Sequence, residues 1–336
     1  MTNKLLCGGK SLNLKSWDDV EIGSKSDLLL GNGFSVNIDR DFSYTKLLSI
    51  ASEKYTDEEK RMFQKFNTVN FEDILYNYKI SAIVSKIYGQ LGFKSDLVKS
   101  EKKVRSSLIR TVQSIHTPYS DINRLDILDK INKEFKKYKR IFTTNYDLIP
   151  YWAIMEDRKK FVDYFWNSGS YFDEFETDIS STKIAIYYLH GGLHIFEDDG
   201  DTYKIISKGK ALLEKVYSEI ENGGMPLFIS EGESSYKLSK IKSSDYLMFC
   251  LRKLRNSEND VVVFGHSFAE TFDQHIIDAL KSGKKKVIAI SIFPFIDDIE
   301  DVTARIKGML PKHKVVFFDS TTHPLGSSDL TPYIYD

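Results

Sequence analysis

The chain has 336 residues, of which 41% are hydrophobic and 13% aromatic, and its formal net charge is −1. This length fits one large domain or two small ones, with enough apolar side chains for a sizeable core. The balanced charge argues against a general electrostatic attraction to nucleic acid or to an anionic membrane. The only cysteines are Cys7 and Cys250, which excludes a disulfide framework and a cysteine-based zinc module.

Residues 1–26 are polar, and we expect them to form a leader with a short turn. They contain no apolar run long enough for a signal peptide. Nowhere does the chain reach the roughly 18 consecutive apolar residues typical of a membrane span. These features predict a protein of the reducing cytoplasm, without a membrane segment and without direct contact to nucleic acid.

The first buried strand is predicted at Asp27–Leu30, an apolar run that ends at Gly31. From Tyr44 to about Lys139 the sequence favours helices, because apolar residues between 71 and 87 recur at helical spacing. We interpret the many lysines and arginines of this stretch as a solvated helix face, with a nucleic-acid-binding patch as the minor alternative.

The second half of the chain alternates between predicted strands and predicted helices. The strands are continuous apolar runs, which is typical of a parallel sheet covered on both faces. They fall at Arg140–Thr144, Lys183–His190, Asp260–Phe264, Lys286–Phe293 and Lys314–Phe318, with helices at about 206–221, 236–256, 270–282 and 298–310. This order predicts an α/β fold, a Rossmann-like doubly wound parallel sheet. We expect residues 27–336 to form one domain that carries a large helical subdomain at about 44–139.

Ligands of doubly wound sheets bind beyond the carboxyl ends of the strands, and polar motifs in this chain follow four such ends. The first motif is Gly31-Asn32-Gly33-Phe34-Ser35. Glycines after a strand allow positive φ and close backbone approach, so that amide groups can face a diphosphate. The alternative is a plain turn. Val36 replaces the last glycine of the dehydrogenase fingerprint, and no acidic strand end follows, so a hydride-transferring enzyme is disfavoured.

The second motif is Thr143-Thr144-Asn145-Tyr146-Asp147. Its asparagine can hold a water or a ribose hydroxyl, and the aspartate can orient a neighbouring group. The alternative is a helix N-cap, a role for which Thr and Asn are common.

The third motif places His190 at a strand end, before Gly191 and Gly192. A histidine with open space above it suits a general base, although a lone histidine is more often structural. Nearby His194 lacks the glycine context, and we assign it a structural role.

The fourth motif is Gly265-His266-Ser267, whose small residues leave room for a ribose or an adenine edge. The alternative is that Ser267 only caps the next helix. Asp273 and His275 follow in that helix. The spacing of the histidines matches no metal-binding motif, so we predict no metal site.

In this order the four motifs resemble those of the sirtuin-like superfamily, and more narrowly the stand-alone bacterial sirtuin-like proteins associated with anti-phage defence. The similarity covers roughly residues 27–280. It implies that Gly31–Ser35 forms the turn that holds the NAD phosphates, with Asn32 in place of the usual small residue. It maps the threonine, asparagine and aspartate of a second family motif onto Thr143, Asn145 and Asp147.

The same resemblance implies that His190 is the catalytic histidine and that Gly265 and Ser267 lie near the adenosine ribose. Two departures matter. The four-cysteine zinc module of sirtuin deacylases is absent, and Asp41-Phe42 is followed by Ser43 where the family has an arginine. The resemblance therefore implies a zinc-free NAD hydrolase with NAD as substrate and no metal.

In this interpretation Asn145 positions water or ribose hydroxyls, His190 acts as base and Asp147 orients them. Two alternatives remain: a regulatory subunit that binds NAD or ADP-ribose without turnover, and a protein deacylase. Because an unregulated NADase would poison its cell, we expect gating by homo-oligomerisation or by a partner, such as an ATPase or a phage-sensing protein. The helical region is the expected contact surface, and the polar turn Phe228–Glu233 is a minor candidate for the pocket lining.

Overall fold

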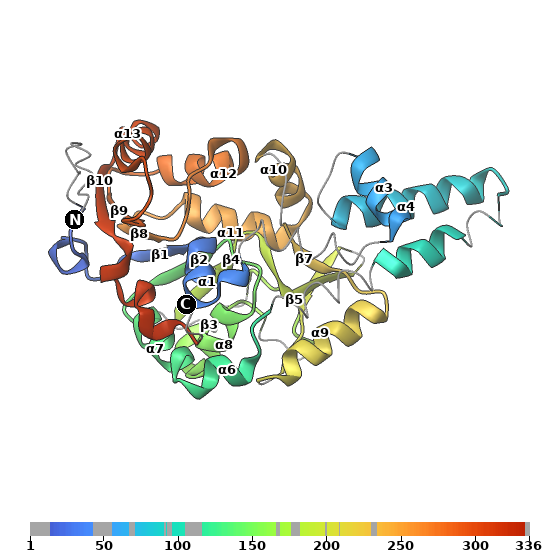
Figure 1. Ribbon diagram of the computed structural model, residues 1–336, viewed down its shortest axis with the longest axis horizontal. Helices are drawn as coiled ribbons and strands as arrows, with labels where there is room; N and C mark the ends of the chain where they lie inside the picture. The colour runs from blue at the N-terminus through green and yellow to red at the C-terminus, as the bar shows by residue number, and fades with distance from the viewer. Residues whose placement is uncertain are drawn as a thin grey trace, which may run out of the picture.

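The structure is a computed structural model that describes most of the chain, and the predicted α/β doubly wound parallel sheet is confirmed. The described residues are 14–42, 56–66, 71–90, 92, 96–104, 116–165, 169–175, 182–198, 200–207, 209–229 and 234–332. A seven-stranded sheet forms the centre of the molecule, with helices on both of its faces (Figure 1).

All seven strands of the main sheet are parallel, in the order β10-β9-β8-β1-β2-β4-β3. The strands are β1 (Asp27–Leu30), β2 (Arg140–Thr143), β3 (Phe161–Val162), β4 (Ile184–Tyr188), β8 (Val261–Phe264), β9 (Val287–Ile292) and β10 (Lys314–Asp319). From β1 the chain first builds the β2 side of the sheet and later returns to build the β8 side. The switch point therefore lies at β1, where Leu30 is in register with Thr143 and Phe264.

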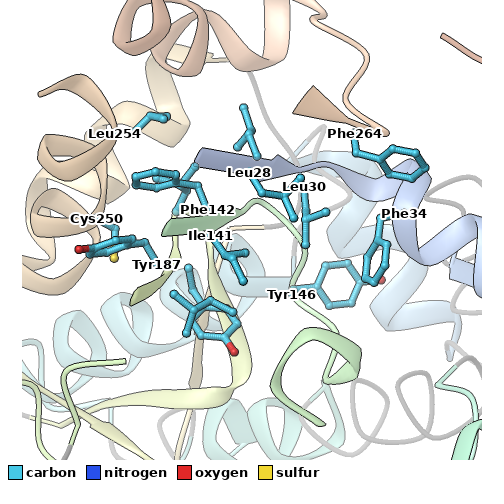
Figure 2. Close-up of a cluster of buried hydrophobic side chains, with 14 of the residues drawn as sticks. Leu28, Leu30, Phe34, Ile141, Phe142, Tyr146, Tyr187, Cys250, Leu254 and Phe264 are labelled. Carbon is cyan, nitrogen blue, oxygen red and sulfur yellow. The ribbon is translucent and has the colours of Figure 1, made fainter. Parts of the chain in front are cut away.

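Helices bury both faces of the central strands, which explains their unbroken apolar runs. Every residue of β1 and of β8 is buried. Figure 2 shows Leu28 of β1 and Phe142 of β2 packed together with Cys250 and Leu254 of a covering helix. The helices around the sheet are α1 (Asn32–Ile38), α6 (Tyr119–Arg124), α7 (Ile127–Phe135), α8 (Ile149–Met155), α10 (Ser234–Ser243), α11 (Asp245–Arg255), α12 (Glu270–Lys281) and α13 (Ile299–Met309).

A second, three-stranded antiparallel sheet was not predicted. It consists of β5 (Gly191–Asp198), β6 (Asp201–Lys204) and β7 (Pro226–Phe228), in the order β6-β5-β7. Helix α9 (Ala211–Glu221) covers it, burying Val216 and Ile220 against Phe196. The glycines that begin β5 resemble a loop in sequence, because glycine is depleted in strands.

The single helix predicted at 236–256 is wrong, because the structure has two helices, α10 and α11, that meet at Ser244. This residue has an extended backbone, with φ −116° and ψ 122°, and its side chain accepts a hydrogen bond from the Leu247 N–H. Serine competes with helix continuation by capping the next helix through its hydroxyl, and apolar periodicity does not report such a break.

The predicted helical region 44–139 contains helices of two kinds. In Figure 1, α3 (Asp57–Lys65) and α4 (Phe71–Ile87) stand to one side of the main sheet. In contrast, α7 buries Ile131 and Phe135 in the main core and packs beside α8. Residues 43–55 and 105–115 lie outside the described residues. Among the described helices, none is long and apolar enough to cross a membrane.

The described part of the predicted leader lies along the β10 edge of the sheet. Lys15 forms a parallel bridge with Phe318. The Trp17 ring lies 4.9 Å from the Phe318 ring, measured between centroids. Residues 1–13 lie outside the described part of the chain.

The turns that follow β1 and β8 touch through their backbones. The Gly31 N–H donates to the Phe264 carbonyl at 2.9 Å, and the Gly33 N–H donates to the Gly265 carbonyl at 2.8 Å. Gly265 has φ +71°, and a Cβ at this residue would lie 2.5 Å from the Phe34 nitrogen. Both the φ angle and the lack of space therefore require glycine at position 265.

We expect Gly265→Ala to lower the free energy of unfolding by more than about 2 kcal/mol, because the clash adds to the roughly 1–2 kcal/mol of a left-handed backbone. Gly283→Ala is the matched control. Gly283 has φ +79°, but a Cβ there would meet only the Ser257 carbonyl oxygen, at 3.5 Å. Urea unfolding of both variants measures the difference. An equal loss in the two would contradict a role for the close approach.

Candidate functional site

A cavity of about 980 Å³ opens at the carboxyl ends of the central strands. This volume is at the upper end of the roughly 300–1,000 Å³ typical of ligand pockets. Its wall includes residues that follow β1 and β2, the carboxyl ends of β8 and β9, and residues of α1, α10, α12 and α13. Its place at the switch point is where a doubly wound sheet binds its ligands.

The structure sorts the predicted site residues into two groups. Those that line the cavity are Asn32, Gly33, Thr144, His190, Gly265, His266 and Ser267. Those that lie outside its lining are Gly31, Phe34, Ser35, Thr143, Asn145, Tyr146 and Asp147. The second group includes two of the three predicted catalytic side chains.

The first glycine turn does not have the predicted geometry. Gly31 has φ −110° and ψ 177°, an extended backbone, and Gly33 is in the first turn of α1 without a positive φ. Both amides are already bonded, that of Gly31 to the last residue of β8 and that of Gly33 to the turn after it. The expectation of positive φ with amides free for a diphosphate is therefore wrong at these two glycines. Their small size instead allows the approach to Gly265.

Ser35 joins the first two motifs. Its hydroxyl donates to Asp147 Oδ2 at 2.5 Å and accepts from Asn145 Nδ2 at 2.7 Å. All three side chains are buried. The Asn145 Oδ1 atom is also buried and has no hydrogen-bond partner among the described residues. An unpaired buried acceptor costs free energy. This oxygen is therefore the atom of the cluster at which a ligand or a water could supply a hydrogen-bond donor.

The N-cap alternative for the second motif is wrong, because the N-cap of α8 is Leu148, which makes no side-chain hydrogen bond. Asp147 Oδ1 accepts the Ile149 N–H at 2.9 Å, at the start of α8. Thr143 instead accepts the Asn145 N–H at 3.0 Å, so neither threonine nor asparagine caps this helix. Burial raises the pKa of Asp147 to about 6, against the lowering effect of its hydrogen bonds from Ser35 and Ile149.

His190 follows β4 by two residues, is buried, and contacts a second histidine. Its Nε2 atom is 2.8 Å from Nε2 of His275, which comes from α12. The Nδ1 atom of His275 is 3.0 Å from the Ser234 hydroxyl, at the start of α10. Burial lowers the pKa of His190 well below its usual range and lowers that of His275 to about 4. Both imidazoles are therefore neutral at pH 7, the form that accepts a proton.

An ion pair borders the two histidines. Lys237 Nζ lies 3.2 Å from Asp273 Oδ1, and the other carboxylate oxygen lies 3.7 Å from His266 Nε2. The Nδ1 atom of His266 accepts the Phe268 N–H at 3.1 Å. Neutral His266 therefore carries its proton on Nε2, which points its N–H toward the carboxylate.

The capping alternative for Ser267 is wrong, because α12 begins after Ala269 and has no side-chain cap. The Ser267 and Phe268 carbonyls instead accept hydrogen bonds from Arg305 of α13, at 3.3 and 2.6 Å. Arg305 thus holds the turn after β8 in place.

Several lining residues had no sequence signal. Lys237 and Arg305 sit in helices whose charges resemble any solvated face, and Ser320 and Thr321 come from a segment after the last strand. Sequence reasoning placed Asp273 and His275 near the fourth motif but gave them no role. Only the fold brings them beside His190.

His194, to which we assign a structural role, is fully buried in β5 with its ring next to those of Tyr151 and Tyr188. Both of its ring nitrogens are buried without a hydrogen-bond partner among the described residues. The turn Phe228–Glu233 is described only as far as Ile229, and residues 230–233 lie outside the described part. The Ile229 N–H donates to the His190 carbonyl at 2.8 Å. Strand β7 therefore supports the backbone of His190.

The fold and the cavity define a Rossmann-like α/β protein with a pocket at its switch point. The chain matches the model of the family described as a domain of unknown function, DUF4917, over residues 28–325, and it belongs to that family. A comparison with curated proteins finds no match.

The buried carboxyl of Asp147 predicts a pH dependence of stability. Because its folded pKa of about 6 lies above the ordinary value of 3.8, its contribution to stability is full below pH ~3.8 and is lost as pH rises through ~6. Asp147→Asn removes this titration. Relative to the variant, the wild type should lose up to about 3 kcal/mol between pH 4 and pH 7.

Urea unfolding of both proteins at several pH values measures this difference. Asp278→Asn, which changes an exposed carboxylate on α12, serves as the control and should follow the wild type. A wild-type curve that stays parallel to that of Asp147→Asn would show that this carboxyl does not titrate in the window.

Proposed function

We propose that this protein hydrolyses the bond between nicotinamide and ribose in NAD, releasing nicotinamide and ADP-ribose, as a gated effector in anti-phage defence. The observation that supports it most is the position of neutral His190 in the wall of the switch-point cavity, beside the turns after β1 and β8. We choose NAD as the substrate because the order of the four motifs resembles that of sirtuin-like proteins.

The cavity residues fit a dinucleotide in size and charge. The volume of about 980 Å³ suits a ligand larger than a single nucleotide. Arg40 and Arg305 line it and provide positive charge for a diphosphate. The amides of Gly31 and Gly33 are already bonded, so diphosphate contacts would come from other donors, such as the side chain of Asn32.

The reaction requires little covalent chemistry from the protein. The electron pair of the glycosidic C–N bond leaves with nicotinamide, and the ribose becomes an oxocarbenium-like cation, as in glycoside hydrolysis. Water adds to the anomeric carbon and loses one proton. In the proposal His190 receives that proton, at Nδ1.

His275 would orient the base. If His190 donates its Nε2–H to His275 Nε2, and His275 donates its Nδ1–H to Ser234 Oγ, the lone pair on His190 Nδ1 remains free. The two distances of 2.8 and 3.0 Å are compatible with this tautomer pair. Histidine bases are commonly oriented in this way by a hydrogen bond to the other ring nitrogen.

Asn145 would hold water or a ribose hydroxyl through Oδ1. Ser35 accepts the Asn145 amide and is itself held by Asp147, so this pair fixes which way the amide points. Because Oδ1 is buried and Asn145 lies outside the cavity lining, the cavity wall would have to open locally when substrate binds. Catalytic hydrogen bonds often tighten only in the substrate complex.

We expect His190→Ala and Asn145→Ala to lower the rate of nicotinamide release by about 10²–10⁴-fold each, the usual contribution of a base or positioning group. The measurement is NAD turnover under activating conditions. His313→Ala is the control, since His313 precedes β10 at the opposite end of the sheet. If the wild type and both variants release nicotinamide at the same background rate, the proposal fails.

One observation favours a second candidate, a regulatory subunit that binds NAD or ADP-ribose without turnover. Asn145 and Asp147 lie outside the cavity lining and are engaged with Ser35. Calorimetry that shows NAD binding, together with no nicotinamide release in any assembly state, would select this alternative.

Gating by assembly is part of the proposal, with a homo-oligomer or an ATPase or phage-sensing partner as the regulator. In the part of the chain that is described, α4 and the residue after it expose apolar side chains: Ile80, Ile83, Val84 and Ile87 in the helix, and Tyr88 after it. Such a stripe favours contact with another surface. We expect the isolated monomer to be weakly active, which size-exclusion chromatography with a turnover assay checks. A fully active monomer would contradict gating.

A further inference from the structure

We propose that His190, Asp273 and His275 form a binding site for one divalent transition-metal ion in the cavity wall. One nitrogen of each histidine and one carboxylate oxygen all lie within 4.8 Å of one another. The inference does not depend on NAD hydrolysis, because it concerns metal binding by the chain alone.

The backbone of α12 is bent in a way that assembles this cluster. Residues two apart in a regular helix point about 200° apart around its axis, so Asp273 and His275 would face opposite sides. The structure departs from the helix at Asp273, with φ −131° and ψ 24°. This break places both side chains next to His190, which approaches from the end of β4.

The two imidazoles offer the form that metals bind. Their Nε2 atoms face each other at 2.8 Å, so one proton lies between two nitrogens. A metal ion would take the place of that proton, which moves to Nδ1 of His190, and would accept the Nε2 lone pairs of both rings. The Ser234 hydroxyl, 3.0 Å from His275 Nδ1, can accept the remaining N–H, as the outer partners of metal-bound histidines usually do.

The donor set selects the kind of metal. Two imidazoles and one carboxylate suit Zn²⁺, Co²⁺ and similar ions, whereas Mg²⁺ and Ca²⁺ prefer oxygen ligands. With metal–nitrogen bonds of about 2.1 Å, the 2.8 Å separation corresponds to an angle of about 85°. That angle fits five- or six-coordination, in which water from the cavity completes the shell. His190 and Asp273 line the cavity, which provides the entry path.

Two neighbours limit the site. His266 cannot be a ligand through Nε2 while its Nδ1 accepts the Phe268 N–H, because the neutral ring then carries its proton on Nε2. Lys237 places an ammonium 3.2 Å from Asp273 Oδ1 and repels a bound cation. Removing the positive charge of Lys237 should therefore strengthen metal binding. If the cluster had only a structural role, this substitution would not raise the affinity for a metal ion.

The test uses untagged, metal-free full-length protein, titrated with Co²⁺ alone and followed by its visible absorption. Zn²⁺ uptake is measured by equilibrium dialysis. We expect one ion per chain. His275→Ala and Asp273→Asn should weaken binding by at least about 100-fold, since changing only an outer partner typically costs 10–100-fold. Lys237→Leu should tighten it, and Asp278→Asn, on the same helix, should leave it unchanged.

Thermal unfolding of each variant verifies the fold. If His275→Ala does not fold, Ser234→Ala tests the same site through its outer partner, with an expected loss of about 10-fold. Absence of saturable uptake by the folded wild type would overturn the proposal. So would an affinity that is unchanged in every folded variant. Neither result depends on NAD turnover, which is assayed separately in the presence of a chelator.

Discussion

The backbone contact between the turns after β1 and β8 is the constraint on which the site depends. Gly33 and Gly265 approach so closely that no side chain fits between them, and the Gly33 N–H is bonded to the Gly265 carbonyl at 2.8 Å. This contact joins the two halves of the sheet at the switch point. It fixes the start of α1, and therefore places Ser35 against Asn145 and Asp147. It also fixes the turn whose carbonyls Arg305 binds.

The main sheet could be predicted because burial on both faces leaves a direct mark in the sequence. Strand β8 is Val-Val-Val-Phe, a run that few other structures accommodate. Strand β5 leaves no such mark, since it begins with two glycines. The first of them, Gly191, has φ +72° and lies against the backbone of Leu227, a long-range contact that only the folded chain reveals. The break at Ser244 was missed for a related reason. The apolar residues continue at helical spacing across it, but the serine side chain caps a new helix and ends the previous one.

The location of the site could also be predicted, since parallel strands bring the residues after them to one edge. The direction of each side chain could not. Asn145 and Asp147 turn toward Ser35 because buried polar groups need hydrogen-bond partners, and the serine supplies them. Glycines predicted to face a phosphate face another turn instead. His275 reaches His190 only because α12 bends at Asp273, and no residue pattern in that helix predicts the bend.

The two proposals meet at the ring of His190, which has one proton and one lone pair in its neutral form. When Nε2 donates to His275, the lone pair is on Nδ1 and the ring can act as a base. When Nε2 binds a metal ion, the proton must lie on Nδ1, and no lone pair remains. A bound cation would also oppose the positive charge that develops on the ribose. Metal binding and base catalysis are therefore mutually exclusive at this residue, so an ion held by His190 and His275 would act as an inhibitor of the proposed reaction.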